Sequence, residues 1–254
     1  MFDIMRGMSN TGNTGTTAQG LFPNTSAFES AAVCWPNPDG FFVNGSYISG
    51  SNNSADFIYI AIRRPMKTPE AGTEVFNAIT RTGTGANATI TGLGFNPDEI
   101  ISQTRGLTYG GIWFSRLRGG NQALYPPSTA LEYTSTNCVT EFSTNGYKLG
   151  TDGSNQINSN TVTYVNWCFK RAAGFMDVVC WTGEPPNTNQ RVSHNLTVAP
   201  ELIIYKGRTK GNYWRVYSGN INQYIALNIN NPIVTGSNFW GTSAPTTTDF
   251  GFNP

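Results

Sequence analysis

Few residues in this chain have side chains suited to acid–base catalysis. The 254 residues include 15 Asp and Glu residues and one His. Two carboxyl groups that flank a glycosidic bond can hydrolyse it, and the candidate pairs are Asp98 with Glu99, or Glu132 with Glu141. Their spacing along the chain does not fix the distance between the carboxyl groups, and acidic residues commonly cap turns. We therefore predict turn capping and solubility for these four residues.

His194 is the single histidine, so any Ser-His-Asp triad would have to form around it. Ser193 lies beside it, but the glycines of a nucleophile elbow are missing. Thr91 occupies the equivalent position in the repeat described below, so the repeated unit does not require an imidazole there. We predict a structural role for His194, no catalytic residues, and a protein that is not an enzyme.

Metal ligands are also sparse. The four cysteines, Cys34, Cys138, Cys168 and Cys180, form no CxxC pair, and one histidine adds little to them. Cys168 and Cys180 lie in successive predicted strands and could form a disulfide, although the pattern favours buried, small apolar side chains. Residues 151–160 lack the alternating carboxylates and the final Glu of a calcium loop, which favours a hairpin loop. We predict no metal and no cofactor.

Aromatic side chains are the candidates for binding chemistry, because their faces stack on sugar rings. Trp113 and Trp214 recur at one position of the repeat, which favours a role in the core. Tyr109, Tyr133 and Trp240 lie in predicted loops or at their edges, and we expect them to contact a glycan or another surface.

The elements that must position these residues are strands. Only 12% of the residues are charged, against about 25% in typical domains, while 13% are aromatic and Gly is abundant. Short apolar segments alternate with turn signals, and no segment keeps a helical period for three turns. Because each sheet must bury one face against another, this pattern predicts an all-β fold of sandwich-like modules.

A repeat of about 100 residues organises the chain. The segment Leu93–Ile101 returns as Leu196–Ile204, and Thr82-Gly83 returns as Thr182-Gly183. Nearer the N-terminus, FIYIAIRR at 57–64 resembles YVNWCFKR at 164–171. A period of this length indicates modules that each have a core of their own.

The repeat predicts one complete and two partial modules. We place a partial N-terminal β module at 1–72, a complete central β-sandwich at 73–171 and a partial C-terminal β module at 172–254. The two prolines and the glycine of residues 64–72 indicate the first connection, and residues 55–64 are expected to form a central strand. We expect the chain to begin within one module and to end within another.

Charge and hydropathy exclude two classes of partner. The formal net charge is +1 and the basic residues are dispersed, so the stripe that binds phosphates is missing and no nucleic acid is expected. No apolar run approaches about 18 residues, the length of a membrane span, and we expect no membrane partner and no signal peptide.

The order of these motifs resembles repeat modules of uncharacterised tailed-bacteriophage proteins, which are common in virion structural proteins of aquatic phages. The resemblance is carried by Gly174-Phe175, Trp181-Thr182-Gly183, Leu93–Arg105, Trp113, Phe142–Gly150 and Tyr164–Phe169. It implies a non-enzymatic structural part of a virion, such as a tail fibre, a capsid fibre or a decoration protein, and it supplies no catalytic residues.

Two expectations about partners follow. Incomplete modules leave strand edges unpaired, so we expect a homo-oligomer, a trimer by analogy with phage fibres, beside other virion proteins and a host surface glycan. The strand at 57–62 could instead complete the last module, or it could belong to a separate N-terminal sandwich. The alternative functions are a carbohydrate-binding, lectin-like adhesin and, with less support, a polysaccharide depolymerase.

Overall fold

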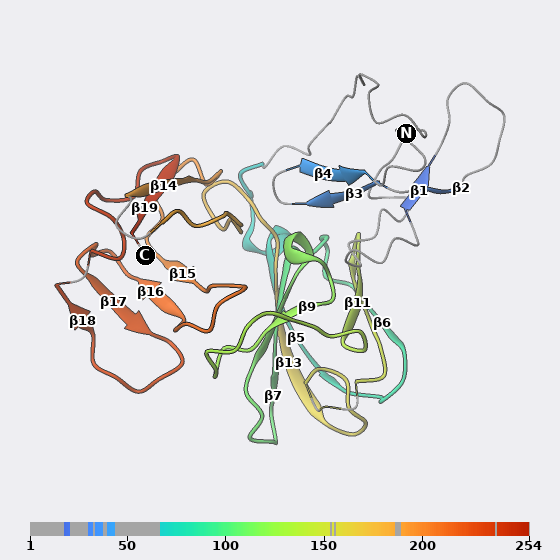
Figure 1. Cartoon of the computed structure of the whole chain (residues 1–254). Helices are drawn as coiled ribbons and strands as arrows, with labels where there is room; N and C mark the ends of the chain where they lie inside the picture. The colour runs from blue at the N-terminus through green and yellow to red at the C-terminus, as the bar shows by residue number, and fades with distance from the viewer. Residues whose placement is uncertain are drawn as a thin grey trace, which may run out of the picture.

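The computed structural model describes residues 67–152, 154, 156–185, 189–236 and 238–253, together with four strands nearer the N-terminus. These strands are β1 (Ala18–Gly20), β2 (Ser30–Ala32), β3 (Cys34–Asn37) and β4 (Gly40–Val43). β1 pairs with β2 and β3 pairs with β4, both antiparallel (Figure 1). The predicted strand at 55–64 lies outside the described residues.

Two antiparallel sheets form the central unit. The larger sheet has the order β10-β9-β8-β7-β13-β5, and the smaller has the order β11-β12-β6. The strands of the larger sheet are β5 (Phe76–Thr82), β7 (Glu99–Thr104), β8 (Ile112–Ser115), β9 (Gln122–Leu124), β10 (Tyr133–Thr134) and β13 (Thr163–Phe169). Those of the smaller sheet are β6 (Ala88–Thr91), β11 (Val139–Ser143) and β12 (Gly146–Leu149).

The two sheets pack face to face on one core. Ile100 of β7 and Phe114 of β8 are fully buried, and so is Tyr147 of β12 on the facing sheet. β13 shows why its sequence forms a strand: Tyr164, Asn166 and Cys168 are buried, while the side chains between them are more exposed, as the period of two requires. The central unit is therefore a β-sandwich.

One glycine is needed for the sheets to reach this arrangement. Gly146 begins β12 with a φ of 158°, and a Cβ built on it would lie 1.9 Å from the carbonyl oxygen of Ile90 in β6. No side chain fits there, so glycine allows β12 to pair with β6 at this point.

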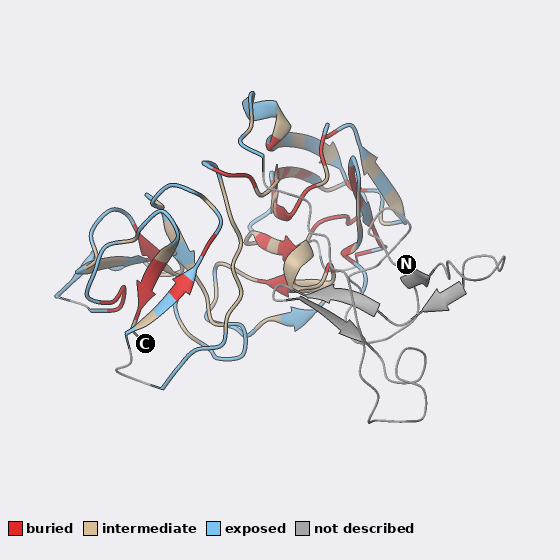
Figure 2. Cartoon of the chain, turned by 90° about the horizontal axis from the view of Figure 1, so that it is seen from above, coloured by how far each residue is buried: buried red, intermediate tan, exposed pale blue. Residues whose placement is uncertain are grey.

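The C-terminal unit contains two smaller sheets. β14 (Gln190–Ser193) pairs with β19 (Asp249–Phe252), and a second sheet has the order β15-β16-β17-β18. The strands of the second sheet are β15 (Ile203–Tyr205), β16 (Arg215–Tyr217), β17 (Gln223–Ala226) and β18 (Val234–Thr235). The core between the sheets is mostly aromatic, and its buried members are Val192, Tyr217, Phe239, Trp240, Phe250 and Phe252. Figure 2 shows buried residues inside both units.

The strand plan of the C-terminal unit repeats that of the central unit. The order β7-β8-β9-β10 corresponds to β15-β16-β17-β18, and the pair β6-β12 corresponds to β14-β19. The register agrees as well, because Ile101 lies opposite Trp113 and Ile204 lies opposite Val216. In the described part of the C-terminal unit, no strand corresponds to β5, β11 or β13.

The predicted all-β, sandwich-like fold is confirmed. The helical turns in the described residues are two 3-10 turns, η2 (Gly72–Glu74) and η3 (Arg116–Arg118). None of the described helices is long and apolar enough to cross a membrane. The module boundaries at 72/73 and 171/172 stay predictions.

Candidate functional site

The two tyrosines predicted to contact other molecules are exposed. Tyr109 lies in the loop between β7 and β8 and is 44% exposed, and Tyr133 lies in β10 and is 36% exposed. The hydroxyl of Tyr133 accepts a hydrogen bond from Nε2 of Gln156 at 2.8 Å, which holds the ring in place. Burial raises the pKa of the Tyr133 phenol. Each ring therefore offers a surface, but no ring contact between them occurs in the described part of the chain.

Trp240 does not lie at the surface, so this part of the prediction is wrong. The residue is 1% exposed, and its ring packs edge-on against Tyr217 and Phe239, with centroids 5.7 Å and 4.9 Å away. Its indole Nε1 donates a hydrogen bond to the carbonyl oxygen of Gln223 at 3.0 Å. The loop turns inward because the small C-terminal unit fills its core with large rings from loops as well as from strands.

Trp113 and Trp214 do not share one position of the repeat. The pairing registers place Val216 at the position of Trp113, so Trp214 lies two residues earlier. The two rings nevertheless meet, edge to face, with centroids 5.1 Å apart. Trp214 is 1% exposed and donates from Nε1 to the carbonyl oxygen of Ser128 at 3.1 Å. The expected core role holds for Trp214, in the contact between the two units.

A group of charged residues lies beside this contact, and we call Glu99, Arg118, Glu132 and Arg208 the junction cluster. Glu132 binds two guanidinium groups, with Oε1 2.6 Å from Nη1 of Arg118 and Oε2 2.6 Å from Nη2 of Arg208. The backbone N–H of Glu132 also donates to the carbonyl oxygen of Arg208 at 2.9 Å. The side chains of Arg118 and Glu132 are 6% and 8% exposed. The cluster therefore ties the C-terminal unit to the central sheet through charge-assisted hydrogen bonds from Arg208, which is 40% exposed, to the carboxylate of Glu132.

Glu99 is the unusual member of the junction cluster. Its Oε1 lies 3.6 Å from Nη2 of Arg118, beyond hydrogen-bonding distance. Burial raises the pKa of the Glu99 carboxyl to about 7, although the Arg118 charge opposes the shift. Burial likewise raises the pKa of the nearby Cys180 thiol, against the opposing charges of Arg208 and Arg118. Glu99 therefore changes its charge near neutral pH inside the junction.

The predicted carboxylate pairs are not brought together as catalytic groups. Asp98 binds Nε of Arg116 at 2.9 Å and accepts the backbone N–H of Arg171 at 2.8 Å. Glu141 pairs with Lys148 at the surface, with 2.9 Å between the charged atoms. The predicted role in solubility is therefore wrong for Glu99 and Glu132, which are buried. The sequence signal for Glu99 was its place directly before the apolar pair Ile100-Ile101.

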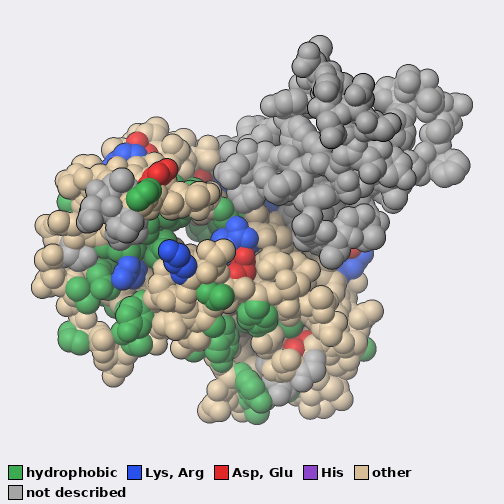
Figure 3. Space-filling view, viewed as in Figure 1, with side chains coloured by type: hydrophobic (Ala, Val, Ile, Leu, Met, Phe, Trp, Pro, Cys, Tyr) green, Lys and Arg blue, Asp and Glu red, His purple; other side chains and the backbone are tan. Residues whose placement is uncertain are grey.

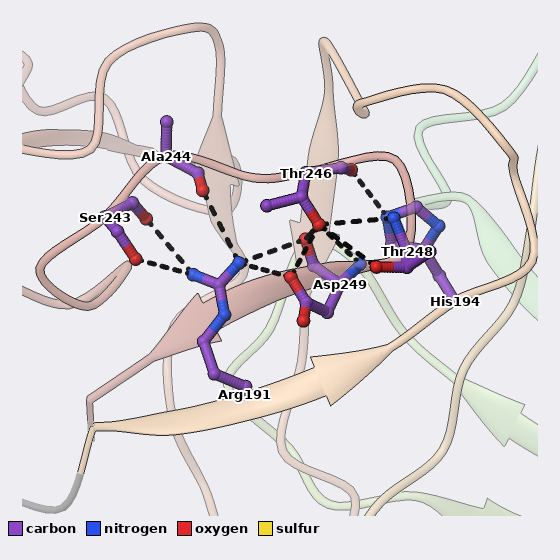
Figure 4. A network of polar contacts seen from close by, with 7 residues as sticks. All are labelled: Arg191, His194, Ser243, Ala244, Thr246, Thr248 and Asp249. Atoms are coloured by element: carbon purple, nitrogen blue, oxygen red, sulfur yellow. Dashed lines mark hydrogen bonds and ion pairs between the residues drawn. The ribbon is translucent and has the colours of Figure 1, made fainter.

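A second polar cluster links β14 to the loop before β19, and Figure 4 shows it. The Arg191 guanidinium donates from Nη2 to the Asp249 carboxylate, and its Nη1 donates to Oγ of Ser243 at 2.9 Å. Oγ1 of Thr246 donates to Oδ1 of Asp249 at 2.7 Å. The hydrogen bond from Thr246 and then the Arg191 contact lower the pKa of Asp249.

His194 lies in this cluster without forming a triad. Its Nε2 is 3.2 Å from the carbonyl oxygen of Thr246, and its Nδ1 accepts the backbone N–H of Leu196 at 3.2 Å. Both ring nitrogens therefore bind backbone groups, and Figure 4 draws no contact between the imidazole and Ser243. The ring stacks on Phe250 with centroids 6.4 Å apart, in agreement with a structural role.

The predicted hairpin loop at residues 151–160 uses its one carboxylate internally. Oδ2 of Asp152 accepts the backbone N–H groups of Ile157 and Asn158, each at 2.6 Å, and Oδ1 accepts that of Ser154 at 3.0 Å. The carboxylate thus shapes the loop. In the part of the chain that the structure describes, no group of three His, Cys, Asp or Glu residues could hold a metal.

The cysteines among the described residues are free thiols. Cys138, Cys168 and Cys180 form no disulfide, and Cys168 is fully buried in the core of the central sandwich. Cys180 lies instead near the junction cluster. The interpretation as buried, small apolar side chains therefore fits Cys168 best.

The outer face of the C-terminal sheet is notably apolar. Ile204 and Ile225 lie opposite Val216 on either side, and they are 39% and 37% exposed. At the ends of these strands, Leu202 is 60% exposed and Leu227 is 49% exposed. Figure 3 shows hydrophobic side chains at several places on one face of this unit. These exposed apolar side chains form a surface that could contact another molecule.

Fold and surface together define an all-β protein of two packed sandwich-like units. A family model described as "Domain of unknown function (DUF7483)" matches residues 71–253. The chain belongs to this family, and the match runs through both units. No curated protein matches the chain, and no solved structure matches it.

Proposed function

We propose that this chain is a non-enzymatic structural component of a bacteriophage virion, a part of a tail fibre, a capsid fibre or a decoration. The observation that supports the proposal most is the repeated strand plan: β7-β8-β9-β10 and β15-β16-β17-β18 have one order, and their first strand pairs have one register. Two units with the same strand order, joined by a buried contact, are suited to a structural component of a virion. The proposed location in the virion rests on the resemblance of the motif order to phage repeat modules.

The polar clusters support a structural role. Three of the four candidate carboxylates are paired: Asp98 with Arg116, Glu132 with Arg118 and Glu141 with Lys148. His194 has both ring nitrogens bound to the backbone. A general base must reach a proton of the substrate, and these groups are already occupied.

Other virion proteins and further copies of the chain are the proposed partners. The exposed Leu202, Ile204 and Leu227 give the C-terminal unit an apolar surface of the kind that assemblies cover. A homotrimer is the first arrangement to test, by analogy with phage fibres.

Labelling of intact particles tests the location. Antibodies against the purified chain, visualised with gold by electron microscopy, should bind at one defined place on phage particles. Labelling confined to debris of lysed host cells, with bare particles, would contradict the proposal.

A carbohydrate-binding adhesin is the second candidate, and the exposure of Tyr109 and Tyr133 favours it. Glycan-array binding that is lost in Tyr109→Ala or Tyr133→Ala, and kept in Phe76→Ala, would favour this candidate. Phe76 is a matched control because it is equally exposed, at 37%, in β5. A polysaccharide depolymerase has less support, and release of reducing ends from host capsule would be its sign.

A further inference from the structure

The edge strand β15 lacks a neighbour that its counterpart has. In the central sheet, β7 pairs with β8 on one side and with β13 on the other. β15 pairs with β16, and no other described strand pairs with it. Because unpaired N–H and C=O groups at a sheet edge readily accept another strand, this edge is open to one.

An extended segment faces the open edge from the position of β5. Val179 and Trp181 pack on the C-terminal core, as Ile79 of β5 packs on the central core. The Trp181 ring reaches Tyr205 of β15, with centroids 5.9 Å apart. No backbone hydrogen bond of residues 179–181 to another described backbone group is present, and none joins this segment to β15. Figure 3 shows the face hollowed in this unit.

In the central unit β13 fills the corresponding place. It pairs with β5 along Thr163–Phe169 and with β7 along Tyr164–Phe169. The C-terminal unit therefore has both walls of a strand site, residues 177–183 and β15, without the strand between them. We call this the strand slot.

The chain contains a second segment with the sequence pattern of β13. Residues 57–64, FIYIAIRR, align with residues 164–171, YVNWCFKR. In β13, Tyr164 and Cys168 face the core, and the aligned residues are the apolar Phe57 and Ala61. We propose that residues 57–64 insert into the strand slot of the same chain and pair with β15 and with residues 177–183.

The register of β13 predicts which residues would meet. Trp167 lies opposite Ile101 of β7, so Ile60 should lie opposite Ile204, which is 39% exposed without it. Val165 lies opposite Thr80 of β5, so Ile58 should lie opposite Cys180. The inserted strand would cover exposed apolar surface and satisfy two rows of backbone groups at once.

The chain can reach the slot within one molecule. The carbonyl oxygen of Val75 accepts the N–H of Lys170 at 2.8 Å, and Ala172 forms a bridge with Met176 at the mouth of the slot. Lys67, the first described residue after this segment, forms an exposed ion pair of 2.6 Å with Glu70. The five residues from Ile62 to Lys67 span up to about 17 Å when extended.

Disulfide trapping in the full-length chain tests the proposal. Ile58→Cys should form a bond with the native Cys180 under mild oxidation, because opposed residues in antiparallel strands lie within disulfide distance. Ile60→Cys with Ile204→Cys, in a Cys180→Ser background, should form a second bond independently of the first. Peptide mapping by mass spectrometry would identify both bonds, in a species that runs as a monomer.

The matched controls separate failure to oxidise from failure to pair. Thr89→Cys with Lys148→Cys, which are exposed and opposed between β6 and β12, reports that oxidation works on this sheet geometry. Tyr59→Cys, on the opposite face of the inserted strand, should not bond to Cys180. Absence of both predicted bonds while the β6–β12 control bonds would overturn the proposal. Covalent dimers through these pairs would overturn insertion within one chain, and neither outcome bears on the virion role.

Discussion

At the residue scale, burial has the largest effect on the pKa of the Glu99 carboxyl. Burial raises the pKa of its carboxyl from 4.5 to about 7, so the folded state binds this proton more tightly than the unfolded chain does. The stability that the protonated carboxyl contributes is complete below about pH 4.5 and is lost as the pH rises through about 7. The junction should therefore loosen on the alkaline side of neutrality.

Glu99→Gln tests this pH dependence because the amide keeps the shape without the charge. We expect the stability of the variant relative to the native chain to rise by about 1–3 kcal/mol between pH 5 and pH 8. Urea unfolding at both pH values measures the difference. Parallel stability profiles for the two proteins would show that Glu99 has an ordinary pKa.

Glu132 carries a different prediction, since its carboxylate neutralises two guanidinium groups. Glu132→Gln would leave the buried Arg118 without its closest counter-charge, and we expect a loss of roughly 3 kcal/mol of folding stability. Glu141→Gln is the matched control, because its pair with Lys148 is exposed and should contribute less than about 1 kcal/mol. Equal effects of the two substitutions on urea unfolding would show that the junction cluster adds no more to folding stability than an exposed ion pair does.

At the element scale, close approach of β12 to β6 depends on a missing side chain. Gly146→Ala would place a Cβ 1.9 Å from the carbonyl oxygen of Ile90, and the two strands would have to separate. We expect a loss of more than about 2 kcal/mol of folding stability. Gly106→Ala, whose added Cβ would meet nothing within 4 Å, should stay within about 0.5 kcal/mol of the native chain. Similar unfolding midpoints for both variants would contradict this reading of the pairing.

The elements were predictable from the sequence where the repeat is strong. Leu93–Ile101 and Leu196–Ile204 predicted the counterparts β7 and β15, because a strand buried on one face keeps its apolar pattern. Trp240 was not predictable in the same way, since the direction of a ring in a loop depends on the space left by the core. The two-residue shift between Trp113 and Trp214 became visible only in the pairing register.

The contacts within the junction cluster could not be predicted from the sequence, for a related reason. Glu99, Arg118, Glu132 and Arg208 are spread over most of two units and meet only because those units pack together. Contacts between residues far apart in the sequence follow from packing and leave no local pattern. Spacing along the chain indicates which side chains are available and not which partners they take, so the contacts predicted for Tyr109 and Tyr133 stay predictions.

At the scale of the whole molecule, the contact between the two units should behave as part of the fold. Trp214 is buried against Trp113 and Ser128, and the junction cluster lies beside it. Trp214→Ala should remove a buried ring and lower the folding stability by about 3–5 kcal/mol. It should also expose the segment between the units. Limited proteolysis would then cut near residues 171–177 in the variant and spare the native chain. Resistance of the variant to such cleavage would show that the units pack without Trp214.

A component of a phage fibre is expected to be an oligomer. Exposed apolar residues such as Leu202 and Leu227 should be covered between copies. By analogy with phage fibres, we expect a trimer. Light scattering coupled to size-exclusion chromatography should give about three times the chain mass of 27.6 kDa. A stable monomer at micromolar concentration would place those surfaces against other partners.

Quantitative mass spectrometry of gradient-purified phage particles tests the proposed structural role in the virion. We expect peptides from both units, at a fixed copy number per particle that is a multiple of three and survives high-salt washing. Absence of the chain from infectious particles, while it accumulates free in the lysate, would contradict the proposal.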